Sequence, residues 1–189
     1  DNPPLDGESL LEWADAMTIR DPNTGDVTRS GFLLTGSAVQ PNIVFGVIAY
    51  QYGAERISED GTKIIFNETD APVKAAQWIL DAFDTHKISS RDISDRYKAF
   101  GQGTGSIFWT GPWTLNGYIN TEGLEFMTAP VSTIGDKFMT WGGVSGLNIF
   151  TTADRPAERL EAGANAVKWL SDNSFLWVTE GRGAPPRIS

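Results

Sequence analysis

Ala99-Phe-Gly-Gln-Gly-Thr-Gly-Ser-Ile-Phe-Trp-Thr-Gly-Pro-Trp-Thr-Leu-Asn-Gly-Tyr-Ile119 is the stretch around which this chain is organised. A glycine-rich turn leads into a short apolar strand, expected over 106–110, and a Gly-Pro break then presents Trp113 at the start of a helix. Glycine allows backbone conformations that other residues avoid, and Pro112 has the φ angle of a first helical turn. We therefore expect Trp113 on a rigid corner between a strand and a helix, which is a good position for holding a ligand.

Size and composition indicate a globular protein with a substantial core. The chain has 189 residues, of which 40% are apolar, enough for one large domain or two small ones. No run approaches the roughly 18 to 20 apolar residues that are needed to cross a bilayer. The polar start Asp1-Asn2-Pro3-Pro4 is no signal peptide, so if the protein is exported, its signal has been removed.

The net charge of −9 argues against nucleic acid or an anionic membrane surface as the main partner, because both are bound by clustered Lys and Arg. A neutral or cationic ligand fits this charge better. The segment from Asp21 to Asp26 resembles the first half of a calcium-binding loop, but the second half is missing, so we expect a plain turn there.

Catalytic chemistry has no positive signal in this sequence. The chain has no cysteine, and His86 is its one histidine, placed at the end of an expected helix. Ser-His and Cys-His catalysis are therefore unsupported, and no cluster suits zinc. A glycosidase would need two opposed carboxylates, and Asp and Glu are too common in this acidic chain for the sequence to test for such a pair. We expect no metal and no cofactor, and the absence of cysteine leaves the compartment open.

Hydrophobic periodicity and turn residues predict an alternation of helices and strands. Ser9 and Glu12 form a capping box for the first helix, Gly53 ends the second, Pro72 begins the third, and Asp154 caps the fifth. The predicted helices span 9–19, 43–52, 72–87, 93–100, 156–170 and about 174–180. The predicted strands span 31–35, 54–58, 62–66, 106–110 and 124–129, with two more strand-like pieces in 138–150.

The chain is rich in tryptophan, with seven such residues. Core packing is the default role for the four in helical patterns, since large aromatic side chains usually belong to cores; these are Trp13, Trp78, Trp169 and Trp177. Three others lie at glycine-rich corners, where a surface role is more plausible: Trp109, Trp113 and Trp141. Of these, Trp109 is expected in the core because it lies on the predicted strand.

Several local patterns occur in an order that resembles one family. The most specific is Phe100-x-x-Gly103 followed by an apolar strand and Gly111-Pro-Trp113. The others are Pro4 with Ser9 to Met17, Asp81-Ala-Phe, Met127-Thr-Ala-Pro, Trp141-Gly-Gly-Val-Ser-Gly and Gly181-Arg-Gly-Ala-Pro-Pro-Arg. Together they resemble the extracellular sugar-type solute-binding proteins of ABC transporters, the maltose-binding-protein family, over most of the chain.

This resemblance implies an α/β fold with the two-lobe architecture of the type II periplasmic-binding proteins, whose lobes close on a ligand held between them. Residues 1–140 would form most of the carboxy-terminal lobe, and residues 141–189 the hinge and the returning segment of the amino-terminal lobe. The family's long opening region has no counterpart before Asp1, and its later helices have none after Ser189. The resemblance therefore implies an internal fragment of a longer receptor.

The same resemblance implies non-catalytic binding of a sugar or oligosaccharide and its delivery to ABC permease subunits in the membrane. It implies a monomer located in the periplasm or outside the cell. A lipid anchor carried by an absent amino-terminal segment is compatible with that location.

A sugar ring has an apolar face and a rim of hydroxyl groups, so its recognition uses a flat aromatic side chain and groups that donate and accept hydrogen bonds. Trp113 matches the family tryptophan that stacks on a sugar ring. The alternative is that Trp113 packs under the Gly-Pro corner.

Further ligand-binding candidates lie between residues 40 and 50. Gln40 and Asn42 match a loop that approaches the ligand in the family, although their amides could equally cap a turn. Phe45 and Tyr50 could extend the aromatic wall, but their helical spacing favours burial.

A last group of candidates consists of Trp141, Gly142 and Gly143. They match a hinge-side segment whose backbone amides and aromatic side chain often reach the ligand in the family. A purely structural role in the hinge is the alternative.

Two other classes of function use the same tryptophans. A carbohydrate-active enzyme or a lectin-like carbohydrate-binding module would also present aromatic side chains to a sugar. A structural or interaction domain would instead bury all the corner tryptophans.

Overall fold

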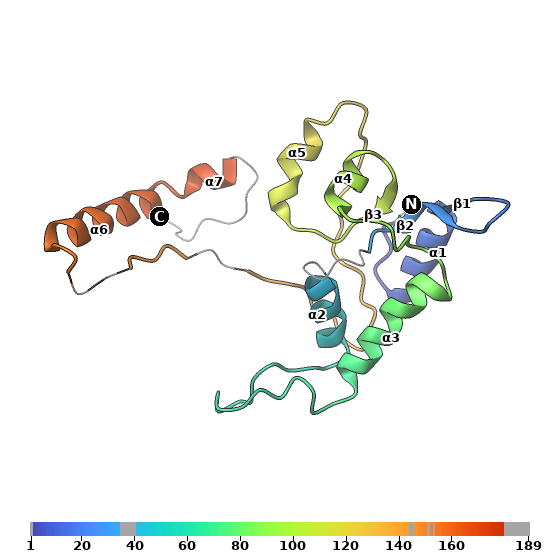
Figure 1. The fold of residues 1–189 in the computed structure, drawn as a ribbon, viewed down its shortest axis with the longest axis horizontal. Helices are drawn as coiled ribbons and strands as arrows, with labels where there is room; N and C mark the ends of the chain where they lie inside the picture. Colours follow the sequence, from blue (N-terminus) through green and yellow to red (C-terminus); the bar gives the residue numbers. More distant parts are fainter. Residues whose placement is uncertain (1, 35–40, 144–145, 151, 153, 180–189) are drawn as a thin grey trace. The chain divides into compact units, whose positions relative to one another are not determined.

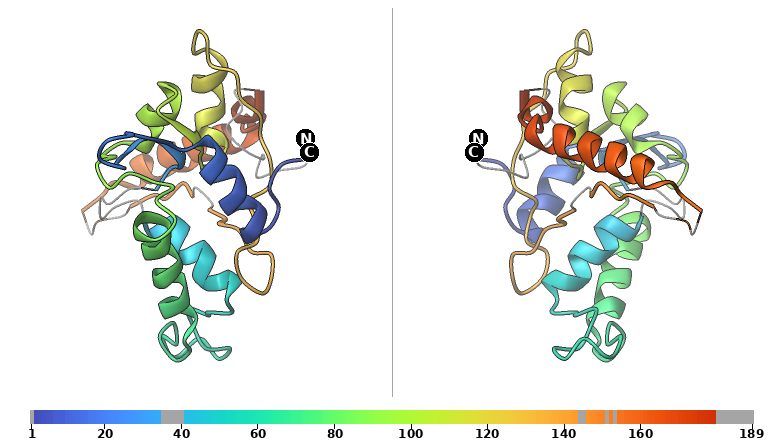
Figure 2. Two further views of the ribbon diagram at one scale, coloured as in Figure 1. Left: turned by 90° about the vertical axis from the view of Figure 1, so that its right-hand side faces the viewer. Right: turned by 90° about the vertical axis from the view of Figure 1, so that its left-hand side faces the viewer.

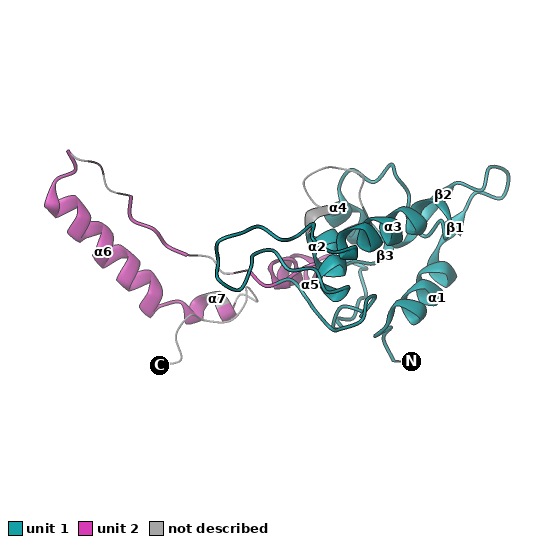
Figure 3. Ribbon diagram, turned by 90° about the horizontal axis from the view of Figure 1, so that it is seen from below, with its two compact units in different colours: residues 1–109, 122–141 teal, residues 110–121, 142–189 magenta. Residues whose placement is uncertain are grey.

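A computed structural model describes residues 2–34, 41–143, 146–150, 152 and 154–179 of the chain. The chain divides into two compact units, shown in Figure 3. Unit 1 comprises residues 1–109 and 122–141, and unit 2 comprises residues 110–121 and 142–189. Each unit is described by itself below.

Unit 1 is built on a three-stranded sheet with the order β1-β2-β3 (Figure 1). Strand β1 (Ile19–Arg20) pairs antiparallel with β2 (Val27–Phe32), and β2 pairs in parallel with β3 (Gly105–Ile107). The parallel register places Ser30 opposite Gly105 and Phe32 opposite Ile107. Because parallel strands need a long connection, helices occupy the chain between β2 and β3.

Four helices complete unit 1. They are α1 (Gly7–Met17), α2 (Pro41–Gln51), α3 (Ala71–Asp84) and α4 (Arg96–Gly101). Helices α2 and α3 lie side by side (Figure 2). The core is formed by α1, α2, α3, the end of β2 and the residues that follow β2 and α3, including Leu10, Phe32, Leu34, Val44, Ile48, Ala75 and Ile88. These segments therefore share one hydrophobic core, as the mixed helix and strand pattern predicts.

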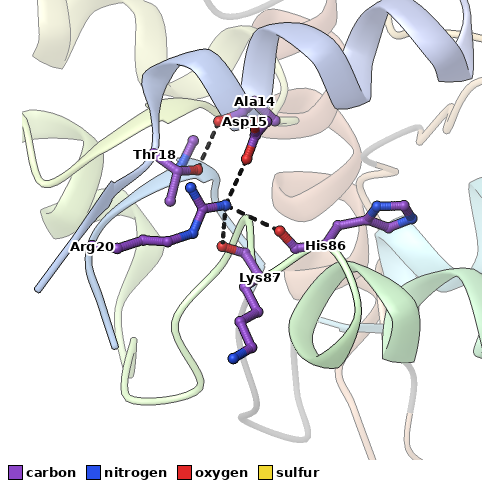
Figure 4. Close-up of polar contacts among 7 residues, drawn as sticks. Ala14, Asp15, Thr18, Arg20, His86 and Lys87 are labelled. Carbon is purple, nitrogen blue, oxygen red and sulfur yellow. Dashed lines mark hydrogen bonds and ion pairs between the residues drawn. The ribbon is translucent and has the colours of Figure 1, made fainter. Parts of the chain in front are cut away.

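Arg20 connects three segments of unit 1 (Figure 4). Its Nη2 atom lies 2.6 Å from the Asp15 carboxylate at the end of α1 and donates to the carbonyl oxygens of His86 and Lys87, both at 3.1 Å. Thr18 Oγ1 donates to the Ala14 carbonyl at 2.7 Å. Because the Arg20 and Asp15 side chains are exposed in part, this ion pair positions segments more than it stabilises them.

Unit 2 contains a 3-10 turn η1 (Pro112–Thr114), α5 (Leu115–Ile119), α6 (Ala157–Asp172) and α7 (Phe175–Thr179). Arg155 donates to the Phe150 carbonyl, and Ile149 lies beside Gly163 of α6. Helix α6 has no buried residue, and Trp169 is 62% exposed. The core position predicted for Trp169 is therefore wrong for this chain, because no residue of its helix is buried.

Several helices begin or end at other residues than predicted, because other residues cap them. Asp6, not Ser9 with Glu12, caps α1: its carboxylate accepts from the Ser9 amide at 2.8 Å, and Ser9 completes the capping box. Helix α6 is preceded by Pro156, not capped by Asp154. Helix α3 ends at Asp84, so His86 lies beyond it. Gly53 has the predicted left-handed backbone, with φ of 93°.

Several predicted strands are absent. Residues 54–66 form one antiparallel bridge between Ile57 and Ile64, both exposed, instead of two strands. The segment 124–129 and the described part of 138–150 have no regular structure. A two-stranded hairpin without a covering sheet is only marginally stable, and β-branched residues alone do not supply a pairing partner.

Replacing Asp6 with alanine is expected to lower the melting temperature at neutral pH, because the first turn of α1 loses its acceptor. Hydrogen bonds from Ser9 hold the pKa of Asp6 below its ordinary value. A depressed folded-state pKa contributes stability above the unfolded value, near pH 4, and loses it as the pH falls through the folded value. Thermal unfolding of both proteins between pH 7 and pH 2 should therefore show the difference shrinking in acid.

Asp6→Ser is the matched control for this experiment. A serine hydroxyl also caps a helix but does not titrate in acid, so this variant should keep much of the stability with a flatter pH dependence. A difference between Asp6→Ala and the wild type that is constant down to pH 2 would contradict the role of the carboxylate.

Candidate functional site

Two glycines of the segment that leads into β3, Gly103 and Gly105, are required for different structural reasons. Gly103 has φ of 70°, in the left-handed region that favours glycine. A Cβ atom at Gly105 would lie 2.3 Å from the Leu33 side chain, so glycine at this position lets the backbone approach Leu33 closely. The Ser30 amide of β2 donates to the Thr104 carbonyl of the turn, and the Leu33 amide, just after β2, donates to the Ile107 carbonyl at the end of β3. The predicted strand after the turn is confirmed, shifted to Gly105–Ile107.

Two tryptophans follow β3 in the chain, and their surroundings differ. Trp109, in unit 1, is 7% exposed and packs edge to face against Phe32 with ring centroids 5.4 Å apart. Its predicted core position is confirmed. Trp113, in unit 2, lies in η1 and is 43% exposed. The Gly-Pro break therefore does lead into helical structure, with Trp113 in its first turn.

The indole of Trp113 lies directly against the backbone of Gly111. A Cβ atom at position 111 would be 1.9 Å from Cζ3 of the indole. Thr114 fixes the same turn, because its amide and its Oγ1 both donate to the Gly111 carbonyl, at 3.3 and 3.1 Å. Glycine at 111 thus lets the ring rest on the main chain while much of the indole stays accessible. This arrangement can present a flat apolar surface to a ligand.

The candidates of the 40–50 region have different surroundings. Gln40 lies outside the described residues. Asn42 lies in the first turn of α2, whose start falls within the predicted loop, and its side chain is not described. Phe45 and Tyr50 are half-buried and both pack against Phe66, with ring centroids 5.9 and 6.2 Å apart. These contacts give the two rings a packing role in unit 1.

Trp141, Gly142 and Gly143 follow one another at the boundary between the units and are all exposed. Trp141 is 45% exposed, and a Cβ atom at Gly142 would meet nothing within 4 Å. Gly142 is therefore not required by local packing. Phe45, Tyr50 and Trp141 belong to unit 1, whereas Trp113, Gly142 and Gly143 belong to unit 2.

Sequence reasoning missed two buried polar residues of unit 1. Gln51, at the end of α2, is fully buried and hydrogen-bonded to the segment 132–139. Arg96 is 1% exposed, and its guanidinium carbon lies 5.2 Å from the Phe108 ring centroid. Both sit in helical patterns as polar positions, which usually indicates solvent exposure. The nearby aromatic residues around Arg96 were the one sequence signal for its burial.

A shallow hollow at the tip of the 54–66 hairpin contains none of the predicted ligand residues. It is lined by Ser58, Glu59, Asp60 and Lys63. Hydrogen bonds from the Ser58 hydroxyl and from Thr62 hold the pKa of Asp60 below its ordinary value. These bonds stabilise the turn itself, so the charged tip has a structural explanation.

The acidic and histidine side chains of the described residues form no group of three or more that could hold a metal ion. None of the helices in 2–34, 41–143 and 154–179 is long and apolar enough to cross a membrane.

Comparison with known proteins gives matches in structure. No protein-family model matches the chain, and no curated protein matches its sequence. A maltose/maltodextrin-binding domain from Bdellovibrio bacteriovorus bound to maltotriose matches with TM-score 0.78 and 20% identity, over 100% of this chain and 49% of the other. A maltotriose-binding protein from Thermus thermophilus matches with TM-score 0.69 and 20% identity, over 97% and 48%.

A third structure is a solute-binding protein of an ABC transporter from Thermotoga lettingae, bound to alpha-D-tagatose. It matches with TM-score 0.70 and 17% identity, over 98% of this chain and 47% of the other. The chain thus spans about half the length of the structures it matches. At such identities the likeness concerns the fold. The chain therefore has, over about half of their length, the type II periplasmic-binding-protein fold of these sugar-binding proteins, as its motifs predict.

Proposed function

We propose that this chain is part of a solute-binding protein that binds a sugar or oligosaccharide for import by an ABC transporter. The observation that carries the proposal is Trp113, an indole that is 43% exposed and rests on the backbone of Gly111. A large aromatic side chain held in one orientation at the surface suits stacking on the apolar face of a sugar ring. The structural likeness to proteins bound to maltotriose and tagatose supports the same class of ligand.

The resemblance supplies the remaining features of the proposal. The ligand would lie between two lobes, and lobe closure would signal binding to permease subunits. Residues 1–140 would form most of the carboxy-terminal lobe, and residues 141–189 the hinge and the returning segment of the amino-terminal lobe. Trp141, Gly142 and Gly143 would contribute from the connecting segment, Asn42 from the first turn of α2, and Gln40 from the residues just before it in the sequence. Phe45 and Tyr50 would support the wall through their packing on Phe66.

The protein would act without catalysis, as a monomer in the periplasm or outside the cell. A lipid anchor belongs to the same proposal. An acidic surface is compatible with a neutral sugar ligand, since binding through stacking and hydrogen bonds needs no clustered cations.

Trp113→Ala is expected to weaken sugar binding by about 1 kcal/mol or more, roughly a fivefold or larger rise in Kd. The reason is the loss of the stacking surface while the Gly111 backbone and α5 remain. Isothermal calorimetry with maltotriose and with tagatose would measure both proteins. Unchanged affinity for a sugar that the wild type binds would remove Trp113 from the site.

Trp169→Ala is the matched control, because Trp169 is also an exposed tryptophan of unit 2 but lies on α6. Its replacement should leave the sugar affinity unchanged. Incubation of the wild type with labelled oligosaccharides separates the receptor from an enzyme: turnover that is abolished by a single carboxylate substitution would overturn the proposal.

A further inference from the structure

Gln51 makes an unusual number of hydrogen bonds to one distant segment. Its Nε2 atom donates to the carbonyl oxygens of Ser132 and Met139, each at 3.0 Å. Its Oε1 atom accepts from the amides of Ile134 at 2.6 Å and Gly135 at 3.3 Å. The side chain thus uses both donor hydrogens and both acceptor sites within residues 132–139.

The backbone of Gln51 reinforces the same connection. Its carbonyl oxygen accepts from the amides of Asp136 at 3.0 Å and Lys137 at 3.2 Å. These bonds satisfy an end of α2 that would otherwise lack partners. A Cβ atom at Gly135 would lie 2.5 Å from the Gln51 carbonyl carbon, so the segment rests directly on the helix end.

A side-chain amide meets the demands of this buried position, whereas a carboxylate does not. Gln51 is 0% exposed, and its four side-chain partners are two carbonyl oxygens and two amides. An amide side chain supplies two donors and an acceptor oxygen with two lone pairs, whereas a carboxylate supplies acceptors alone. Because buried polar groups without partners are costly, the amide fixes the segment in one arrangement.

The fixed segment ends just before the candidate ligand residue Trp141. The last bond from Gln51 reaches Met139, two residues before Trp141, and the described residues from Thr140 to Phe150 are exposed and have no regular structure. Gln51 is therefore a buried anchor for the segment that leads to the boundary between unit 1 and unit 2.

We infer that Gln51 is a positioning residue for Trp141: it clamps residues 132–139 onto α2 and so sets where the indole is presented. The clamp itself stands on the hydrogen bonds above, while its effect on ligand rests on the proposed sugar-binding function.

Gln51→Glu tests the clamp with little change in shape. The carboxylate can still accept from Ile134 and Gly135, but it cannot donate to the Ser132 and Met139 carbonyls and repels them. Hydrogen exchange of the full chain should become faster in 132–143 while the core strands β2 and β3 stay protected. Unchanged exchange in 132–143, or faster exchange throughout unit 1, would overturn the inference. If this variant does not fold, Gln51→Met removes the same bonds at similar volume.

A double-mutant cycle tests whether the clamp acts through Trp141. Gln51→Glu should raise the Kd for maltotriose on the order of tenfold, and this effect should vanish when Trp141 is already alanine. An equal effect in both backgrounds would indicate a merely structural role and reject positioning. Ser132→Ala is the control: it removes a bond from Ser132 Oγ to the Pro4 carbonyl and leaves the Gln51 bonds intact.

The proposed sugar binding and the positioning role of Gln51 can be rejected separately. If the wild type binds neither maltotriose nor tagatose, the proposed sugar ligand is overturned for this chain, and the exchange experiment alone decides the clamp. If it binds sugar and Gln51→Glu binds equally well, the positioning role is overturned while the proposed function stands.

Discussion

Phe32→Ala is expected to lower the free energy of unfolding by about 3 to 5 kcal/mol, the range for removing a fully buried aromatic side chain. Phe32 is 0% exposed at the end of β2 and packs edge to face against Trp78 and Trp109, at centroid distances of 6.1 and 5.4 Å. The substitution leaves a cavity that two large indoles border, and such rings have few ways to fill it.

Urea unfolding followed by circular dichroism measures this effect, with unchanged m values as the check on two-state behaviour. Phe138→Ala is the matched control, because Phe138 also belongs to unit 1 but is 57% exposed. It should change stability by less than about 0.5 kcal/mol. Equal effects of the two substitutions would show that the packing of Phe32 against Trp78 and Trp109 is not central to the stability of unit 1.

Local signals in the sequence predict the elements that depend on neighbours along the chain. The apolar run ending at Gly53 predicts α2, and Pro72 with a regular apolar repeat predicts α3. The turn, strand and Gly-Pro break of 99–119 predict β3 and η1. In each case a proline, a glycine or a period of 3.6 residues marks the element, so no distant contact has to be known.

Elements that depend on distant partners could not be predicted in this way. The two-residue strand β1 exists because Arg20 and its neighbour pair with β2, and no periodicity can be seen in two residues. Residues 124–129 look like a strand but have no strand beside them. The helix predicted over 156–170 is confirmed as α6, but a pattern of residues does not say whether anything covers the apolar side of a helix.

The residues of the candidate site also differ in whether they depend on neighbours along the chain or on distant partners. The exposed position of Trp113 could be anticipated because Gly111 and Pro112 create a corner, a local feature. Gln51 could not be recognised because its partners lie about 80 residues later in the chain. Only the fold brings the end of α2 to the segment before Trp141, so a polar residue in a helical pattern gave no hint of its role.

Gly31→Ala is expected to destabilise the chain by roughly 3 kcal/mol, at the upper end of the usual cost of overpacking. A Cβ atom at position 31 would lie 1.7 Å from the carbonyl oxygen of Ala14 and 2.6 Å from Thr18 Oγ1. The first of these is backbone at the end of α1 and cannot rotate away. The helix must therefore move off β2, which also breaks the bond from the Gly31 amide to Thr18 Oγ1.

Gly46→Ala makes this a paired experiment, because the same methyl group is added at a buried glycine that has room for it. At position 46, within α2, a Cβ atom would meet only the Tyr50 ring, at 3.9 Å. Alanine should stabilise the helix there by up to about 1 kcal/mol. Opposite shifts of the urea midpoint are thus expected from one chemical change. A Gly31→Ala variant as stable as the wild type would mean that α1 has room to accept a methyl group from β2, and a destabilised Gly46→Ala variant would mean that α2 lacks the space seen around position 46.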